Sequence, residues 1–230
     1  MVEPTDPDHA ALSWLQLQDS ALPSGRFVHS YGLEAWLAAF PAAGEAEVAT
    51  LAGRFVAGSV ATLDAVVLAH TADADHTELV RLDRLLLSYK TAASARSSSQ
   101  TGGQRLARLA IDAFDGLDAS PYLAEVAAGA VPGNLAVVEG HVHAELGVPV
   151  RNAVLGHLRA AYAGFLSAGV RLGRLGPVAV QRLVHRHRAA LSELAGLAAS
   201  RSLDDLGSSV PELDLYAMTH ETRTARLFAT

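Results

Sequence analysis

Histidine pairs are the first feature of this chain that could do chemistry, since imidazole is a common metal ligand. The pairs are His141-x-His143 and His185-x-His187. Residues two apart on a helix point about 200° away from each other, so neither pair can chelate from one helical face. The helical ligand spacing His-x-x-x-His is absent from the sequence. We therefore expect no metal site and no bound cofactor, with His187 packed on an apolar stripe and the other three solvated.

Nucleophilic and nucleotide chemistry also find little support. Ser30 follows His29, but adjacent side chains on a helix do not face each other, and no Gly-x-Ser-x-Gly elbow exists. The chain has no cysteine, and its only lysine, Lys90, follows no glycine-rich phosphate loop. Gly102-Gly103 follows a helical pattern, so we interpret it as a helix break that lets two backbones approach. These residue patterns therefore favour neither nucleotide hydrolysis nor nucleophilic catalysis.

Charge and hydropathy narrow the class of partner. Eighteen basic and 24 acidic residues give a net charge of −6, and no basic stripe emerges, which argues against nucleic acid. The longest stretch without Asp, Glu, Lys or Arg lies between Glu125 and Glu139 and is too short for a membrane span of about 18–20 residues. The first 20 residues are acidic, unlike a secretory signal. We expect a cytoplasmic protein that binds no membrane.

Helical periodicity dominates the elements that must position these residues. One stripe recurs at intervals of three and four residues: Val48, Leu51, Phe55, Ser59, Leu63 and Val66. Ser120-Pro121 is typical of a helix start, while Gly147-Val148-Pro149 and Gly176-Pro177 are typical of a helix end followed by a new start. No sustained alternation indicates a strand. We predict an all-α protein of about eight to ten helices.

The same patterns suggest three parts. Residues 1–10 are acidic and unpatterned, which favours a mobile arm, and residues 11–208 form a single all-α domain. Pro211 separates the last amphipathic segment from the body, so residues 209–230 are predicted to be a C-terminal tail that docks on a partner. The alternative is that this tail packs on its own body.

One segment, Leu17 to Glu34, is unusually dense in special residues. Proline and glycine shape a turn there, and Ser30 can cap a helix that begins near Gly32. This segment resembles the signature of the UreF family of urease accessory proteins. The matching residues are Asp19, Ser20, Pro23, Gly25, Phe27, His29, Ser30, Gly32, Leu33 and Glu34.

Two further segments resemble the same family in the same order. The first matches at Arg96, Ser99, Gly103, Leu106 and Leu109. The second is the C-terminus, where the segment from Ala217 to Phe228 resembles the family's ending, with matches at Met218, His220-Glu221 and Arg226-Leu227-Phe228. The sequence departs from the family at Arg26, Val28 and Asn134.

The resemblance implies an all-α homodimer without catalytic activity or cofactor. Such proteins bridge a UreD/UreH-type accessory protein and the UreG GTPase, and they modulate GTP-dependent nickel insertion into apo-urease. A His-rich metallochaperone that binds nickel itself is the alternative. The resembling segments lie at helix ends and in a tail rather than in a recognisable pocket. The candidate partner-binding residues are Arg26, His29, Ser30, Tyr31, Glu34, Arg96, Ser99, Gly103, Tyr216, Met218, His220, Glu221, Arg223, Arg226 and Phe228.

Overall fold

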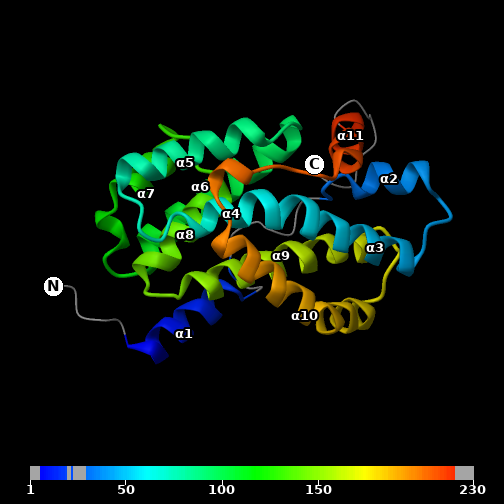
Figure 1. Ribbon diagram of the computed structural model, residues 1–230, viewed down its shortest axis with the longest axis horizontal. Coiled ribbons are helices and arrows are strands. Elements are labelled where there is room, and N and C mark those ends of the chain that lie inside the picture. Colours follow the sequence, from blue (N-terminus) through cyan, green and yellow to red (C-terminus); the bar gives the residue numbers. More distant parts are fainter. Residues whose placement is uncertain (1–5, 20–21, 23–29, 221–230) are drawn as a thin grey trace.

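The computed structural model describes residues 6–19, 22 and 30–220, and the regular elements of this part of the chain are all helices, without a strand (Figure 1). The predicted all-α class is therefore confirmed. The α-helices are α1 (Pro7–Leu17), α2 (Leu33–Ala39), α3 (Glu45–Phe55), α4 (Ala65–Ala69), α5 (His76–Tyr89), α6 (Ala93–Ala113), α7 (Pro121–Ala128), α8 (Leu135–Glu145), α9 (Val150–Arg171), α10 (Pro177–Ser200) and α11 (Pro211–His220).

Helices α3 and α4 are joined without a break by a π-helix, η1 (Val56–Asp64), so the described residues hold ten continuous helices longer than one turn. The apolar stripe predicted for this region thus does follow one helix, but the sequence gives no sign of its widened middle. Two short 3₁₀ turns, η2 (Leu117–Ala119) and η3 (Leu203–Asp205), complete the described elements.

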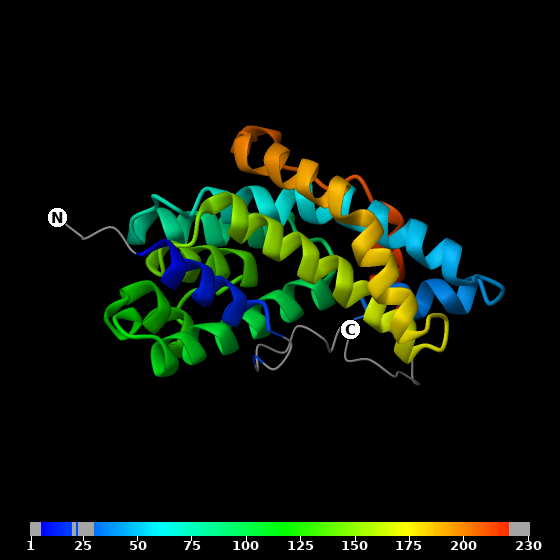
Figure 2. The same ribbon diagram turned by 90° about the horizontal axis from the view of Figure 1, so that it is seen from below.

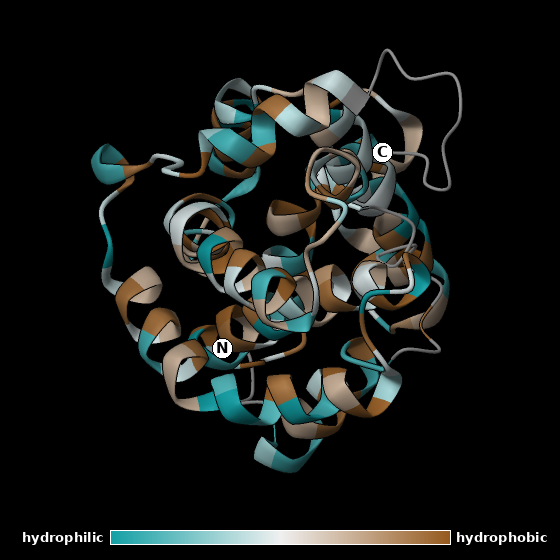
Figure 3. Ribbon diagram, turned by 90° about the vertical axis from the view of Figure 1, so that its right-hand side faces the viewer, coloured by the Kyte–Doolittle hydropathy of each residue, from teal (hydrophilic) through white to brown (hydrophobic). Residues whose placement is uncertain are grey.

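The joined helix Glu45–Ala69 is long and apolar enough to cross a membrane by length and composition. However, 56% of its most apolar window is buried inside the fold, as expected for the core helix of a bundle. Helix α8 is buried even more completely, from Ala136 to His143. The outer helices carry both hydrophobic and hydrophilic residues along their length (Figure 3).

Most helix boundaries follow the predicted signals. The Ser120 hydroxyl accepts a hydrogen bond from the Leu123 amide at the start of α7, and Pro121 occupies its first turn. Helices α9 and α10 begin directly after Pro149 and at Pro177. These boundaries were readable because capping is a local interaction between neighbouring residues.

Other local predictions need correction. Helix α1 begins at Pro7, capped by the Asp6 carboxylate, so residues 7–10 are helical rather than an unpatterned arm. Helix α6 runs uninterrupted through Gly102-Gly103, so these glycines do not break it.

The last described helix, α11, packs against α2, so two helices far apart in the sequence lie side by side (Figures 1 and 2). Leu213 is buried in this contact. The Glu212 carboxylate joins the two elements, accepting a hydrogen bond from the Trp36 indole (3.1 Å) and pairing with Arg54 (3.1 Å). Residues 211–220 therefore pack on the protein's own body, which is the alternative stated for the tail.

Candidate functional site

A partly enclosed cavity of about 160 Å³ lies where the three family-resembling segments meet. Tyr31 comes from the first segment, Ser98 and Ser99 come from α6, and Leu213 and Ala217 come from α11. The expectation that the resembling segments lie away from any recognisable pocket is therefore wrong, because each of them contributes at least one residue to this lining. Tyr31 and Leu213, more than 180 positions apart in the sequence, meet only because α11 packs against α2.

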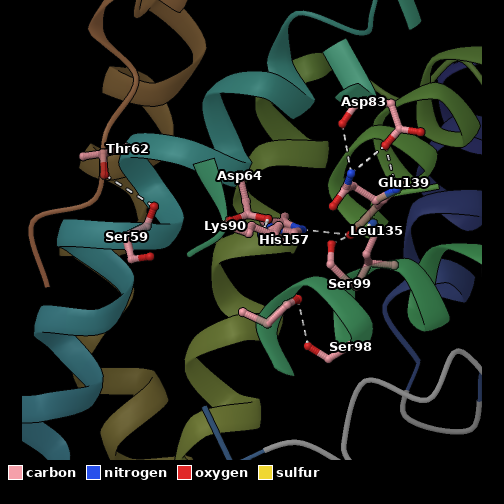
Figure 4. A network of polar contacts seen from close by, with 12 residues as sticks. Ser59, Thr62, Asp64, Asp83, Lys90, Ser98, Ser99, Leu135, Glu139 and His157 are labelled. Carbon is pink, nitrogen blue, oxygen red and sulfur yellow. Dashed lines mark hydrogen bonds and ion pairs between the residues drawn. The ribbon is translucent and has the colours of Figure 1, made fainter. Parts of the chain in front are cut away.

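Two polar pairs stand in the wall of this cavity (Figure 4). The Lys90 ammonium lies 2.6 Å from the Asp64 carboxylate of the π-helix, and both side chains are largely buried. The Glu139 carboxylate on α8 lies 2.8 Å from Nδ1 of His157 on α9, also buried. Burying charged groups is costly unless they are paired, so the pairs fix these helices relative to one another.

The first segment contributes Tyr31 to the cavity wall, and Tyr31 and the next residue, Gly32, both have a positive φ. The Tyr31 ring packs on Phe55 and Phe165, with centroids 5.0 and 6.3 Å away. A Cβ on Gly32 would lie 2.7 Å from the Leu213 carbonyl oxygen, so glycine allows α11 to approach. Gly32, not the Ser30 side chain, is the N-cap of α2, which corrects the predicted cap.

Two further candidates of this segment are described. Ser30 is fully buried, and its carbonyl accepts a hydrogen bond from the Leu33 amide. Glu34 is half-buried in the first turn of α2, where a carboxylate interacts favourably with the helix dipole. Arg26 and His29 lie outside the described residues.

The α6 candidates make contacts within the fold. Nη1 of Arg96 donates hydrogen bonds to the carbonyls of Lys90 and Thr91, each at 2.7 Å. The Ser99 hydroxyl accepts from the Leu135 amide at the start of α8 (3.2 Å). The roles that the structure gives these two residues are to hold the loop before α6 and the start of α8.

Gly103 is buried where α6 meets the loop before α8. A Cβ there would collide with the Gly133 carbonyl oxygen and would lie 2.9 Å from its carbonyl carbon. The predicted close approach of two backbones is therefore confirmed, and the neighbouring backbone belongs to residues 133–134.

The C-terminal candidates differ in how far the structure describes them and in how exposed they are. Tyr216 is half-buried, with its ring edge on Phe40 (6.3 Å between centroids), whereas Met218 is exposed. His220 ends α11, and its side chain is not described. The remaining candidates, Glu221, Arg223, Arg226 and Phe228, lie outside the described residues.

The prediction that His141 and His143 are exposed to solvent is wrong. His141 and His143 are buried in α8 rather than solvated. Burial lowers the pKa of His141, with Glu145 partly opposing it, and His141 Nε2 lies 2.8 Å from the Ser120 hydroxyl. Nδ1 of His143 lies 2.6 Å from the Glu139 carbonyl oxygen. Imidazoles that fall inside a helix buried on all sides must be buried with it.

His187 packs as predicted on its apolar stripe. Its ring stacks on Tyr162 with centroids 4.5 Å apart, and its Nδ1 lies 3.0 Å from the Tyr162 hydroxyl. Burial raises the pKa of Tyr162 to about 12. His185 on the same helix is exposed, as predicted. Among the described residues, no group of three or more His, Asp or Glu side chains lies close enough to hold a metal ion.

Sequence reasoning missed the buried polar contacts that organise the site. Besides the two cavity pairs, the buried Asp83 carboxylate accepts hydrogen bonds from the amides of Gly133 (2.6 Å) and Asn134 (2.7 Å). The only available signal was composition, since Glu139 and His157 each have apolar residues or glycine on both sides in the sequence and Lys90 is the only lysine. Such a signal marks a residue but does not name its partner.

Known proteins resemble the chain over nearly its whole length. The family model described as UreF matches residues 42–188, which is more than half of the chain. The chain belongs to the UreF family. A urease accessory protein UreF from Paenarthrobacter aurescens is 30% identical over 217 residues, covering 94% of this chain and 96% of that protein. One from Cereibacter sphaeroides KD131 is 33% identical over 226 residues, covering 96% and 99%.

Membership of the UreF family confirms the resemblance carried by the three segments. Two of them, residues 17–34 and the C-terminus, lie outside the matched range 42–188, but the aligned lengths of the relatives extend across at least most of the chain. The cavity at which the segments meet is therefore the candidate functional region of a UreF-family protein.

Proposed function

We propose that this chain is a urease accessory protein without catalytic activity of its own. It acts in the cytoplasm as a homodimeric scaffold that bridges a UreD/UreH-type protein and the UreG GTPase, and it modulates GTP-dependent nickel insertion into apo-urease. Membership of the UreF family over nearly the full chain supports this proposal most directly. The contribution of all three segments to one cavity supports a common surface for them.

The surface formed by α2 and α11 suits a docking role. Leu215 and Met218 lie three residues apart on α11 and are both exposed, and Phe40 at the end of α2 is exposed beside Tyr216. Neighbouring exposed apolar side chains of this size are typical of protein interaction sites. In the C-terminal segment 209–230, α11 would then offer its exposed face to the partner while its other face stays packed on the body.

A matched pair of substitutions tests this surface. Leu215→Asp on α11 and Leu197→Asp on α10 both replace an exposed leucine, 63% and 60% accessible, with the same charge. We expect Leu215→Asp to abolish co-purification with the UreD/UreH-type protein and to reduce urease activation in a reconstituted system. Leu197→Asp should leave both unchanged, and both variants should keep the wild-type melting temperature because neither side chain is in the core.

The outcome that contradicts the docking surface is full co-purification by the Leu215→Asp variant. Two further measurements test the scaffold itself. Purified protein should hydrolyse no GTP above background, and it should enhance nickel-dependent urease activation only when the UreG GTPase is present. Equilibrium dialysis with nickel separates the metallochaperone alternative, which requires a tight, stoichiometric site on the isolated chain.

A further inference from the structure

A second, shallow pocket lies between α5, α6 and the loop that follows α7. It is lined by Arg84 of α5, by Ser97, Gln100, Thr101 and Gln104 of α6, and by loop residues 129–132. The spacing of three and four residues places the four α6 side chains on one helical face. This polar face stands apart from the cavity under α11, and none of the roles discussed above uses it.

Arg84 gives this pocket a positive charge. Among the described residues it is the only ionisable one in the lining, and no described carboxylate shares the pocket with it. Within the described residues its exposed guanidinium forms neither an ion pair nor a hydrogen bond, whereas Arg81 one turn earlier pairs with Glu78 at 2.6 Å. A guanidinium with its planar fork available recognises a carboxylate through two parallel hydrogen bonds.

The remaining side chains suit a peptide backbone. Glutamine amides and serine or threonine hydroxyls each donate and accept hydrogen bonds, as peptide groups do. Gln100, Gln104 and their neighbours run along α6, so they can follow a segment of chain instead of surrounding one small ion. The pocket is open at the surface, which also favours a segment of a larger partner.

The loop that forms the far wall is held in place from both helices. The Asp83 carboxylate, next to Arg84 on α5, accepts hydrogen bonds from the Gly133 and Asn134 amides at 2.6 and 2.7 Å. Nη2 of Arg108 on α6 donates to the Ala127 carbonyl (3.1 Å). A wall fixed before binding loses little conformational entropy when a ligand arrives, which favours affinity.

We infer that this pocket binds an extended, acidic segment of a partner protein. A carboxylate of the segment pairs with Arg84, and its backbone amides pair with the side chains of the α6 face. The inference rests on the proposed function, because the partners tested are the three proteins of urease maturation. It adds a second contact, distinct from the surface of α2 and α11.

Charge reversal tests the inference against a matched control. Arg84→Glu and Arg186→Glu change the net charge equally, and Arg186 is an exposed arginine of α10 without an ion pair or hydrogen bond to the described residues. Titrations would measure the affinity of each variant for the UreD/UreH-type protein, the UreG GTPase and apo-urease. We expect Arg84→Glu to weaken binding to one of them about tenfold or more, and Arg186→Glu to change it less than about twofold.

Wild-type affinity of Arg84→Glu for all three proteins would overturn the inference while leaving the proposed function intact. Absence of any binding by the wild-type chain would overturn both. A photo-reactive benzoylphenylalanine placed at Gln100 gives an independent readout. The cross-linked partner peptide should contain Asp or Glu within a few residues of the cross-link, and a neutral or basic peptide there would contradict the proposed chemistry.

Discussion

Gly103→Ala tests whether the α6 segment that resembles the family serves the fold. The added methyl group would meet the backbone of residues 133–134, with the Gly133 carbonyl carbon at 2.9 Å and the Asn134 carbonyl carbon at 3.1 Å. Backbone atoms cannot move away as the end of a flexible side chain can, and this loop is held to α5 by Asp83. We therefore expect the added methyl group to destabilise the fold by about 3 kcal/mol, at the upper end of the usual cost of overpacking.

Helix propensity acts in the opposite direction. Alanine is favoured over glycine in a helix interior by about 1 kcal/mol, so the net destabilisation of Gly103→Ala is about 2 kcal/mol. For a domain of this size, that corresponds to a fall in melting temperature of about 4–8 °C. The change should appear mainly as lost stability, since Gly103 is buried.

Gly196→Ala is the matched control. Gly196 lies inside α10, and apart from the local backbone of that helix no atom of the described residues lies within 4 Å of where its Cβ would be. The same substitution should therefore stabilise the protein by about 0.5–1 kcal/mol. Thermal unfolding followed by circular dichroism, with urea titration at 25 °C, measures both variants. The reasoning is refuted if Gly103→Ala melts at or above the wild type or above Gly196→Ala.

Two other predictions concern the buried polar groups. Lys90→Met should lower the free energy of unfolding by about 3–5 kcal/mol, because it leaves the Asp64 carboxylate without its ammonium partner. Adding Asp64→Leu should recover much of that loss. Urea titration of the single and double variants checks this, and a double variant no more stable than Lys90→Met would contradict it. Burial lowers the pKa of His141 in the folded protein below its value in the unfolded chain, which is about 6.5. The neutral side chain therefore contributes its full stability at a pH above about 6.5, and this contribution is lost as the pH falls towards the pKa of the folded protein. His141→Gln, which keeps a hydrogen-bonding group near Ser120, should therefore lose less stability than the wild type between pH 7 and pH 5, and equal losses in the two proteins would contradict this origin.

Local chemistry accounts for what the sequence predicted well. The helix starts at Pro121 and Pro177 and the apolar stripe of the joined helix depend on residues a few positions apart. Caps, fixed proline angles and helical periodicity act over that range, so the sequence alone determines the all-α class and the helix boundaries that carry such signals. The three resembling segments were also visible in the sequence, and they identified the family.

The tertiary structure alone decided which residues meet. Asp83 and Gly133 are 50 positions apart, and Trp36 and Glu212 are 176 positions apart. The burial of His141 depends on the helices packed around α8, not on its neighbours in sequence. Each such contact depends on how whole helices pack, and this packing is decided by many weak interactions along the helices together. A single residue type or spacing therefore cannot reveal these contacts, and the cavity shared by the three segments emerged only from the fold.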